Sequence, residues 1–214
     1  EKVHAIQAAG LDVWCGLIVG FDADDEGVFD RQIAFVERSR ISHAMAGMLA
    51  AIPKTPLHQR LQRAGRLDEA GAAEFGTNVL PARMSRERLR DGYVDLQGRL
   101  HAPEAWFDRL DRLFLDGGFR FGRPRADWLR RRPLARWRTA ATEAVLAAGV
   151  FARLLARVDD RGLRRVYARR MARFVGRRPE PAAWMVYAIK CAIHWHHYSM
   201  ARRMARDGAA VNTF

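Results

Sequence analysis

The spacing of apolar and polar residues changes along the chain. Residues 11–21 form an apolar run, interrupted by Gly16 and Gly20, that is typical of a buried parallel strand opening into a polar loop. Residues 28–39 repeat apolar side chains at helical intervals, and residues 41–52 form a second apolar run. This order predicts a strand–helix–strand unit with parallel strands and a right-handed crossover.

Beyond residue 55 the apolar periodicity is helical almost throughout. Ser85 is a good N-cap, and Pro103 and Pro181 are good first-turn residues. An irregular connector is expected at 66–82, and a helix broken around Pro133 is expected at 128–138. Helices are expected at residues 2–9, 28–39, 56–64, 85–100, 103–117, 140–157, 161–175 and 181–206.

The charge of the chain is uneven. Its 214 residues carry a formal net charge of +13. Residues 1–60 hold 6 Lys or Arg against 8 Asp or Glu, and residues 61–214 hold 31 against 16, so a domain boundary is placed near Arg60. A basic helical surface fits nucleic acid, anionic lipid or an acidic partner. Solvated helix faces rich in Arg explain the same excess without any partner.

The cysteine content and the length of the hydrophobic runs bear on where in the cell the protein is found. Cys15 and Cys191 are too few and too far apart for a disulfide framework or a zinc signature, so a cytoplasmic location is expected. No signal peptide opens the chain, and the longest apolar stretch, 181–193, is too short to span a bilayer. The chain begins at Glu1 within a helical pattern, which predicts a fragment whose N-terminal part lies elsewhere.

The first apolar run and the loop after it hold the candidate chemistry. Glycines inside a strand mark the close approach of a ligand or of another backbone, and both alternatives stay open for Gly16 and Gly20. The acidic loop could bind a ribose or an amino group, or could cap the next helix through Asp24 or Asp25. Its carboxylates are Asp22, Asp24, Asp25 and Glu26.

These residues resemble a known family. The run Gly16-x-Ile18-x-Gly20 with acidic residues up to Glu26 resembles the fifth-strand motif of radical S-adenosylmethionine enzymes. The stretch from Met45 to Ile52, continuing into Pro53-Lys-Thr-Pro-Leu57, is similar to their sixth strand and its exit. Three further stretches resemble the cobalamin-binding subgroup, which includes hopanoid C-2 methylases: Phe29-Asp-Arg-Gln-Ile33, Gly76-Thr-Asn-Val79 and Met84-Ser-Arg-Glu87.

The resemblance implies a fold and a set of cofactors. The expected fold is an α/β fragment, the last strands of a partial TIM-like (β/α) barrel, followed by an all-α helical domain. Residues 1–60 would end the barrel, 61–84 would connect, and 85–214 would form the helical domain. The implied cofactors are S-adenosylmethionine, a [4Fe–4S] cluster and cobalamin. The cluster ligands and the cobalamin domain would lie upstream, so the fragment alone is expected to be inactive.

The resemblance also implies roles for particular residues. Gly16, Ile18 and Gly20 would pack on the adenine of S-adenosylmethionine, and the backbone around Ala50 and Ile52 would line the same site. Glu26 lies two positions later than the family glutamate, so the carboxylate that takes that role stays open among the four of the loop. No catalytic residue and no metal ligand is assigned to this chain. The implied reaction is methyl transfer to an unactivated carbon of a small-molecule or lipid substrate.

Two further clusters lie in the helical part. His194, His196 and His197 are interpreted as aromatic-rich packing or substrate contact, with a metal site as the less favoured alternative. A basic stripe on the 161–175 helix could contact an anionic membrane, making the protein membrane-peripheral, or could simply be solvated. Nucleic acid is the least favoured partner because no recognition motif is present. The stripe consists of Arg161, Arg165, Arg169 and Arg173.

Overall fold

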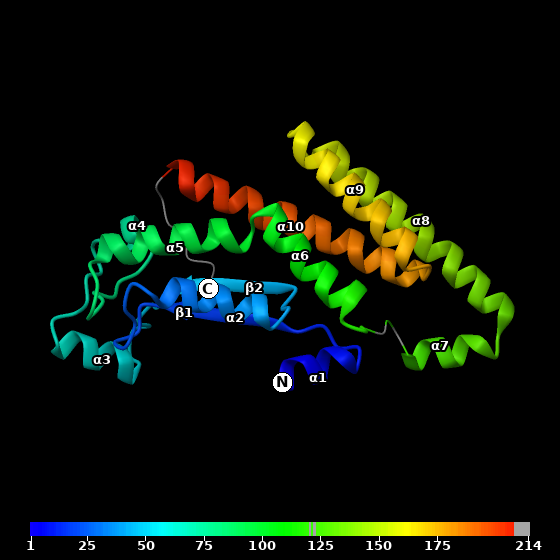
Figure 1. The fold of residues 1–214 in the computed structure, drawn as a ribbon. Helices are drawn as coiled ribbons and strands as arrows, with labels where there is room; N and C mark the ends of the chain where they lie inside the picture. The colour runs from blue at the N-terminus through cyan, green and yellow to red at the C-terminus, as the bar shows by residue number, and fades with distance from the viewer. Residues whose placement is uncertain (120, 122, 208–214) are drawn as a thin grey trace. The chain divides into compact units, whose positions relative to one another are not determined.

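The computed structural model describes residues 1–119, 121 and 123–207. These residues divide into two compact units. One unit, here called the helical unit, comprises residues 1–13 and 103–198; the other, here called the sheet unit, comprises residues 14–102 with the chain after residue 198. Each unit is built around its own elements, shown in Figure 1.

The sheet unit confirms the predicted strand–helix–strand order. Strands β1 (Trp14–Val19) and β2 (His43–Met48) pair in parallel, and α2 (Val28–Arg38) connects them. The register places Gly16 opposite Met45. The described residues contain this two-stranded sheet but no closed barrel, so the barrel part of the expected fold is not seen.

Both strands are shorter than the apolar runs that predicted them. The first run continues to either side of β1, and the second ends in a loop before α3 (Pro56–Arg63). Gly20 explains the first boundary, since its φ of +104° turns the chain out of the extended conformation. The expected irregular connector contains one short helix, α4 (Ala72–Phe75), and an antiparallel bridge between Leu67 and Val79.

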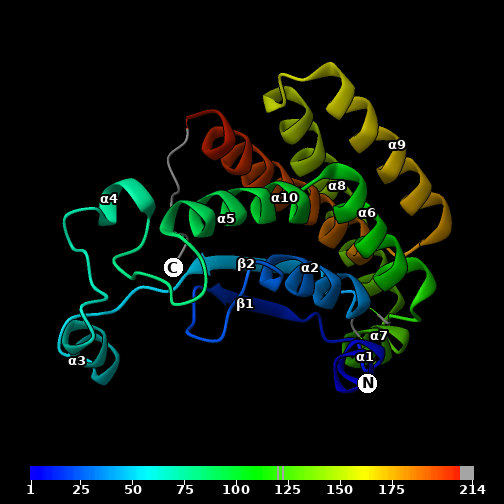
Figure 2. The ribbon, with the colours of Figure 1, turned by 60° about the vertical axis from the view of Figure 1, so that its left-hand side comes forward.

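Helix α5 (Arg86–Leu100) completes the sheet unit by packing on α2 and β2, as Figure 2 shows. Its predicted N-cap is confirmed, because the Ser85 hydroxyl accepts a hydrogen bond from the Arg88 N–H. Gly92 lets the two helices approach closely: a Cβ at this position would lie 2.2 Å from the ring of Phe29. The sheet is therefore covered on one side by helices that follow each strand.

The helical unit is formed by consecutive helices around one aromatic core. Phe107, Phe114, Tyr167, Phe174 and Tyr187 are fully buried in this core. Its elements are α1 (Lys2–Ala8), α6 (Pro103–Asp111), a π-helical turn η1 (Arg112–Asp116), α7 (Arg123–Arg130), α8 (Pro133–Arg157), α9 (Arg161–Arg177) and α10 (Pro181–Asp207), whose last residues belong to the sheet unit.

The predicted break around Pro133 is confirmed, because α7 ends at Arg130 and α8 begins at Pro133. Helix α8 starts seven residues earlier than the predicted 140–157 helix. Proline is favoured there because the first N–H of a helix has no acceptor inside it. Helix α9 begins as predicted after Asp160, whose carboxylate accepts from the N–H groups of Gly162 and Leu163.

Candidate functional site

The candidate site is one face of β1 and the loops beyond the strand ends. Alternation along the strand puts Trp14, Gly16 and Ile18 on one face. Trp14 and His43 confirm that paired residues share a face, since their ring centres lie 4.6 Å apart. Ile18 is 40% exposed and Gly16 is exposed, whereas Val19 on the other face is fully buried. The predicted contact residues Gly16 and Ile18 thus lie on an accessible apolar surface.

Gly20 has a structural role at the end of the same strand. It is buried, and a Cβ added to it would approach the Leu89 side chain to 3.1 Å. With its positive φ, this close approach favours the packing alternative for Gly20. The two glycines of the motif therefore lie in different surroundings, one on the open face and one in the turn.

The two edges of the sheet differ. The Val19 carbonyl accepts from the Leu49 N–H at 2.8 Å, so the backbone of Gly16 and Ile18 faces away from β2. On that edge of β1, the Ile18 carbonyl accepts from the Gln32 side chain at 2.9 Å.

The opposite edge, on β2, is closed by polar side chains of α5. The Ala46 carbonyl accepts from the Tyr93 hydroxyl at 3.1 Å and from the Gln97 amide at 2.8 Å. Tyr93 and Gln97 are themselves buried. One carbonyl of the β2 edge is therefore occupied by buried side chains, and the β1 edge, with the exposed Gly16, is the edge that we consider open to a further strand.

Two carboxylates of the acidic loop stabilise its conformation. Asp24 accepts from the N–H groups of Gly20 and Phe21, both at 2.9 Å, instead of capping the following helix. Asp22 forms ion pairs with Arg60 and Arg66. Hydrogen bonds first from Arg60 and then from Arg66 hold the pKa of Asp22 below its usual value.

The other two carboxylates lie nearer to α2 and are exposed. Asp25 accepts from the Gly27 N–H at 3.0 Å and pairs with Arg31 at 2.8 Å, and the hydrogen bond from Arg31 is the main cause of its lowered pKa. Glu26 pairs with Arg88 at 3.0 Å while 63% of its side chain stays exposed. The N-cap of α2 is Gly27, so the expectation that Asp24 or Asp25 caps this helix is wrong.

The chain after β2 is fixed by a contact that sequence reasoning did not identify. Asn78 donates to the Ala51 carbonyl at 2.9 Å and accepts from the Ala51 N–H at 2.8 Å. This pair of hydrogen bonds imitates a neighbouring strand and buries Ala51. The flanking residues Ala50 and Ile52 remain exposed, Ile52 at 67%. The predicted lining residues of the second loop are thus presented by a rigid backbone.

The cysteines and histidines do not assemble a metal site among the described residues, which contain no group of three or more potential ligands. Cys191 is fully buried, and burial raises the pKa of its thiol. His194 is buried too, and its Nδ1 lies 2.6 Å from the Tyr167 hydroxyl in an aromatic cluster. His194 is therefore a packing residue, as the sequence favoured.

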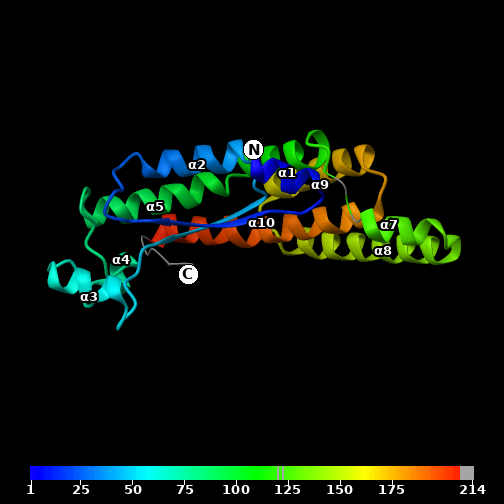
Figure 3. The same ribbon diagram turned by 90° about the horizontal axis from the view of Figure 1, so that it is seen from below.

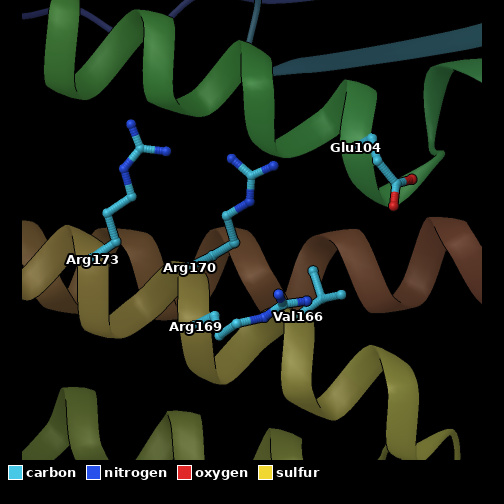
Figure 4. Close-up of a pocket in the computed structure, with 5 residues that line it drawn as sticks. All are labelled: Glu104, Val166, Arg169, Arg170 and Arg173. Atoms are coloured by element: carbon cyan, nitrogen blue, oxygen red, sulfur yellow. The ribbon is translucent and has the colours of Figure 1, made fainter.

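A hollow of about 260 Å³ lies in the helical unit between α6 and α9. Arg170 and Arg173 point towards the helix that carries Glu104, whereas Arg169 lies along α9 (Figure 4). The Asp111 carboxylate binds Arg170 at 2.8 Å and Arg173 at 3.0 Å. Since Asp111 binds two of the three arginines of this lining, the hollow is a weak candidate for binding an anion.

Comparisons with known proteins relate the chain to one domain family and to two named relatives. Residues 55–210 match the family model described as a domain of unknown function (DUF4070). Over 122 residues the chain is 34% identical to an uncharacterized methyltransferase of Synechocystis sp., covering 55% of this chain and 23% of that protein. Over 111 residues it is 33% identical to the hopanoid C-2 methylase of Rhodopseudomonas palustris, covering 52% of this chain and 20% of that protein.

The chain therefore spans about a fifth to a quarter of the length of the curated relatives that it matches. No solved structure matches the chain significantly.

Proposed function

The chain belongs to the family of the domain of unknown function DUF4070, and on that premise we propose that it is the C-terminal portion of a radical S-adenosylmethionine methyltransferase. Methyltransferase names are carried by the relatives of Synechocystis and Rhodopseudomonas. The radical S-adenosylmethionine class comes from the resemblance of the two strands and their loops. The substrate is proposed to be a small molecule or lipid that is methylated at an unactivated carbon.

The observation that supports the proposal best is the open face of β1. Ile18 offers an exposed apolar surface, and the neighbouring Gly16 leaves room for a flat ring to lie against the strand. Helices α2 and α5 cover the opposite face. Ala50 and Ile52 stand beyond the end of the adjacent strand. Such a surface at the carboxyl ends of parallel strands is where α/β proteins bind ligands.

The residues of this chain fit the adenosine part of S-adenosylmethionine. Ile18 would pack against the adenine, and the backbone at Ala50 and Ile52 would border it. The side chain of Glu26 is 63% exposed, more than that of Asp25 or Asp22, and we assign it to the ribose or the amino group. When bound, the cofactors of this class supply a carbon-centred radical and a transferable methyl group.

The fit does not extend to the [4Fe–4S] cluster or to cobalamin. A cluster of this type needs several thiolates close together. Cys15 lies in β1, in the sheet unit, while the buried Cys191 belongs to α10 in the helical unit. We therefore assign the cluster ligands and the cobalamin site to other parts of the full-length protein, one strand of which would lie along the β1 edge at Gly16.

The proposal is tested in the full-length protein with its cluster reconstituted. Formation of 5′-deoxyadenosine is measured against S-adenosylmethionine concentration for the wild type, for Ile18→Ser and for Phe35→Ser. Phe35 is a matched control, because it is 42% exposed on α2. Ile18→Ser is expected to raise KM about tenfold by removing an apolar contact, and Phe35→Ser should leave it unchanged.

Two results would overturn the proposal. One is a full-length reading frame without a CxxxCxxC motif, because no other arrangement in the chain provides the cluster. The other is an Ile18→Ser variant with wild-type KM for S-adenosylmethionine.

A further inference from the structure

Helix α8 has a composition that a water-facing helix rarely has. Of its residues from 139 to 152, Glu143 is the one that carries a charge. Among the described residues α8 is the helix long and apolar enough to cross a membrane by length and composition, although only 11% of its most apolar window is buried. A helix that is apolar on most sides is usually buried on most sides. In α8, most of the apolar surface is exposed instead.

The buried side of α8 is narrow. Ala147 and Leu154 are buried, and Val150, Phe151 and Leu155 pack against the core of the helical unit. The other side of the helix lies outside this core. Figures 1 and 3 show α7 and α8 at the outer side of the helical unit.

The outward side is a continuous apolar stripe. Leu134, Trp137 and Val145 are 79%, 71% and 71% exposed. Their spacing, with the alanines between them, follows the three- and four-residue intervals of one helix face. The stripe consists of Leu134, Trp137, Ala141, Val145, Ala148 and Ala152.

Arginine and tryptophan gather at the start of this helix. Trp128 on α7 is 51% exposed and is covered on one side by the guanidinium of Arg132, 4.4 Å from its ring centre. Arg131, Arg136 and Arg138 form no ion pair within the described part of the chain, and Arg131 and Arg138 are exposed. Exposed aromatic rings beside unpaired cations, next to an apolar stripe, are the arrangement that suits the headgroup region of a bilayer.

We propose that the α7–α8 elbow is a docking surface for an anionic phospholipid membrane. Helix α8 lies along the interface, with Leu134, Trp137 and Val145 in the acyl boundary and Arg131 and Arg138 among the phosphates. It does not span the bilayer, since its buried side is part of the protein core. The inference stands on the surface itself and is independent of the proposed methyltransferase function.

An anionic surface fits better than a neutral one or a protein partner. Each arginine near an anionic surface strengthens binding about fivefold. The apolar stripe alone would suit a second copy of the chain, but like-charged arginines at its end would then be brought together. A bilayer with acidic headgroups satisfies both the stripe and the cations at once.

The test is vesicle flotation of the 214-residue chain. Phosphatidylcholine vesicles are compared with vesicles containing about one third phosphatidylglycerol, for which partitioning should be at least about tenfold stronger. The double variant Leu134→Ser, Trp137→Ser should lose about tenfold or more of its binding to the anionic vesicles. The charge variant Arg131→Gln, Arg138→Gln should approach the binding seen with phosphatidylcholine alone.

The matched control removes two exposed arginines from α9, Arg161→Gln with Arg165→Gln, and should bind as the wild type does. Circular dichroism and gel filtration accompany every variant. The proposal is overturned if the stripe variant floats like the wild type, or if the α9 pair carries the binding. It is overturned as well if the chain dimerises without binding vesicles and the stripe variant is monomeric, because the stripe is then a protein interface.

Discussion

Helices α8 and α9 follow one another in the helical unit and share a composition of arginine, alanine and leucine, yet their exposed sides differ. On α9, arginines bind protein carboxylates: Arg170 and Arg173 share Asp111, and Arg177 pairs with Asp116. On α8, the exposed side is apolar, and Arg131, Arg136 and Arg138 near its start form no ion pair among the described residues. Helix α9 turns much of its charge inward, while α8 turns apolar surface outward.

This difference shows that an arginine stripe in a sequence does not by itself define a membrane-binding face. Of the four residues in the predicted stripe on α9, Arg173 is held by Asp111, whereas Arg161, Arg165 and Arg169 are exposed and form no ion pair among the described residues. Cations that already have carboxylate partners contribute little to binding an anionic surface. On α8, exposed cations stand beside an exposed apolar stripe, and this combination is what calls for an external partner.

The largest expected effect concerns the carboxylate that holds α9. Asp111 is 8% exposed in its side chain and binds two arginines. Asp111→Ala should lower the free energy of unfolding by about 3 kcal/mol, because it leaves partly buried guanidinium groups without a counter-ion. Urea unfolding measures the change. Asp108→Ala is the control, since Asp108 is 57% exposed and its loss should cost at most about 1 kcal/mol; equal effects would contradict the comparison.

The next effect is a pH dependence on α10. Burial, with a smaller contribution from His196, lowers the pKa of His197 to about 4. As the pH falls, His197 therefore takes up a proton in the unfolded chain at a higher pH than in the folded chain. The contribution of the neutral His197 to stability is complete above about pH 6.5 and is lost as the pH falls towards 4.

His197→Asn should remove about 1–2 kcal/mol of the stability difference between pH 7 and pH 4.5, with a discount for partial exposure. Urea unfolding at both pH values measures the difference. A variant that keeps the wild-type difference would show that His197 titrates normally.

A smaller effect separates two arginines of the predicted α9 stripe. Arg173→Ala removes an ion pair to the buried Asp111 and should cost about 1 kcal/mol. Arg169→Ala removes an exposed side chain for which no ion pair is observed among the described residues and should change stability by less than about 0.5 kcal/mol. Thermal unfolding of the two variants shows which substitution costs more stability. A larger loss for Arg169→Ala would contradict the stabilising role assigned to Arg173.

Local signals were enough to predict several of the elements. The helices beginning after Ser85 and Asp160 and at Pro181 were predictable because N-caps and first-turn prolines act within a few residues. The open face with Gly16 and Ile18 was not predicted in this way: the apolar run indicated a buried strand, and the roles of both residues came from the resemblance.

Contacts between distant residues could not be read from the sequence. Asn78 holds Ala51 from 27 positions away, and Arg170 reaches Asp111 across 59. The exposed stripe of α8 was missed for a related reason: periodicity shows an apolar face but not whether anything covers it. The barrel was expected from resemblance, and the described strands supply two parallel members of a sheet.

The smallest expected change in stability is on the exposed side of α8. Leu134→Ala combined with Val145→Ala should alter the free energy of unfolding by less than about 0.5 kcal/mol, because both side chains are already in contact with water in the isolated chain. Leu154→Ala on the buried side of the same helix is the contrast, and should cost about 2–4 kcal/mol through lost apolar contacts and a cavity. Urea unfolding without vesicles measures both variants against the wild type. A large loss for the Leu134 and Val145 variant would mean that the stripe already packs within the protein, and α8 would then resemble α9 in having its partners inside the chain.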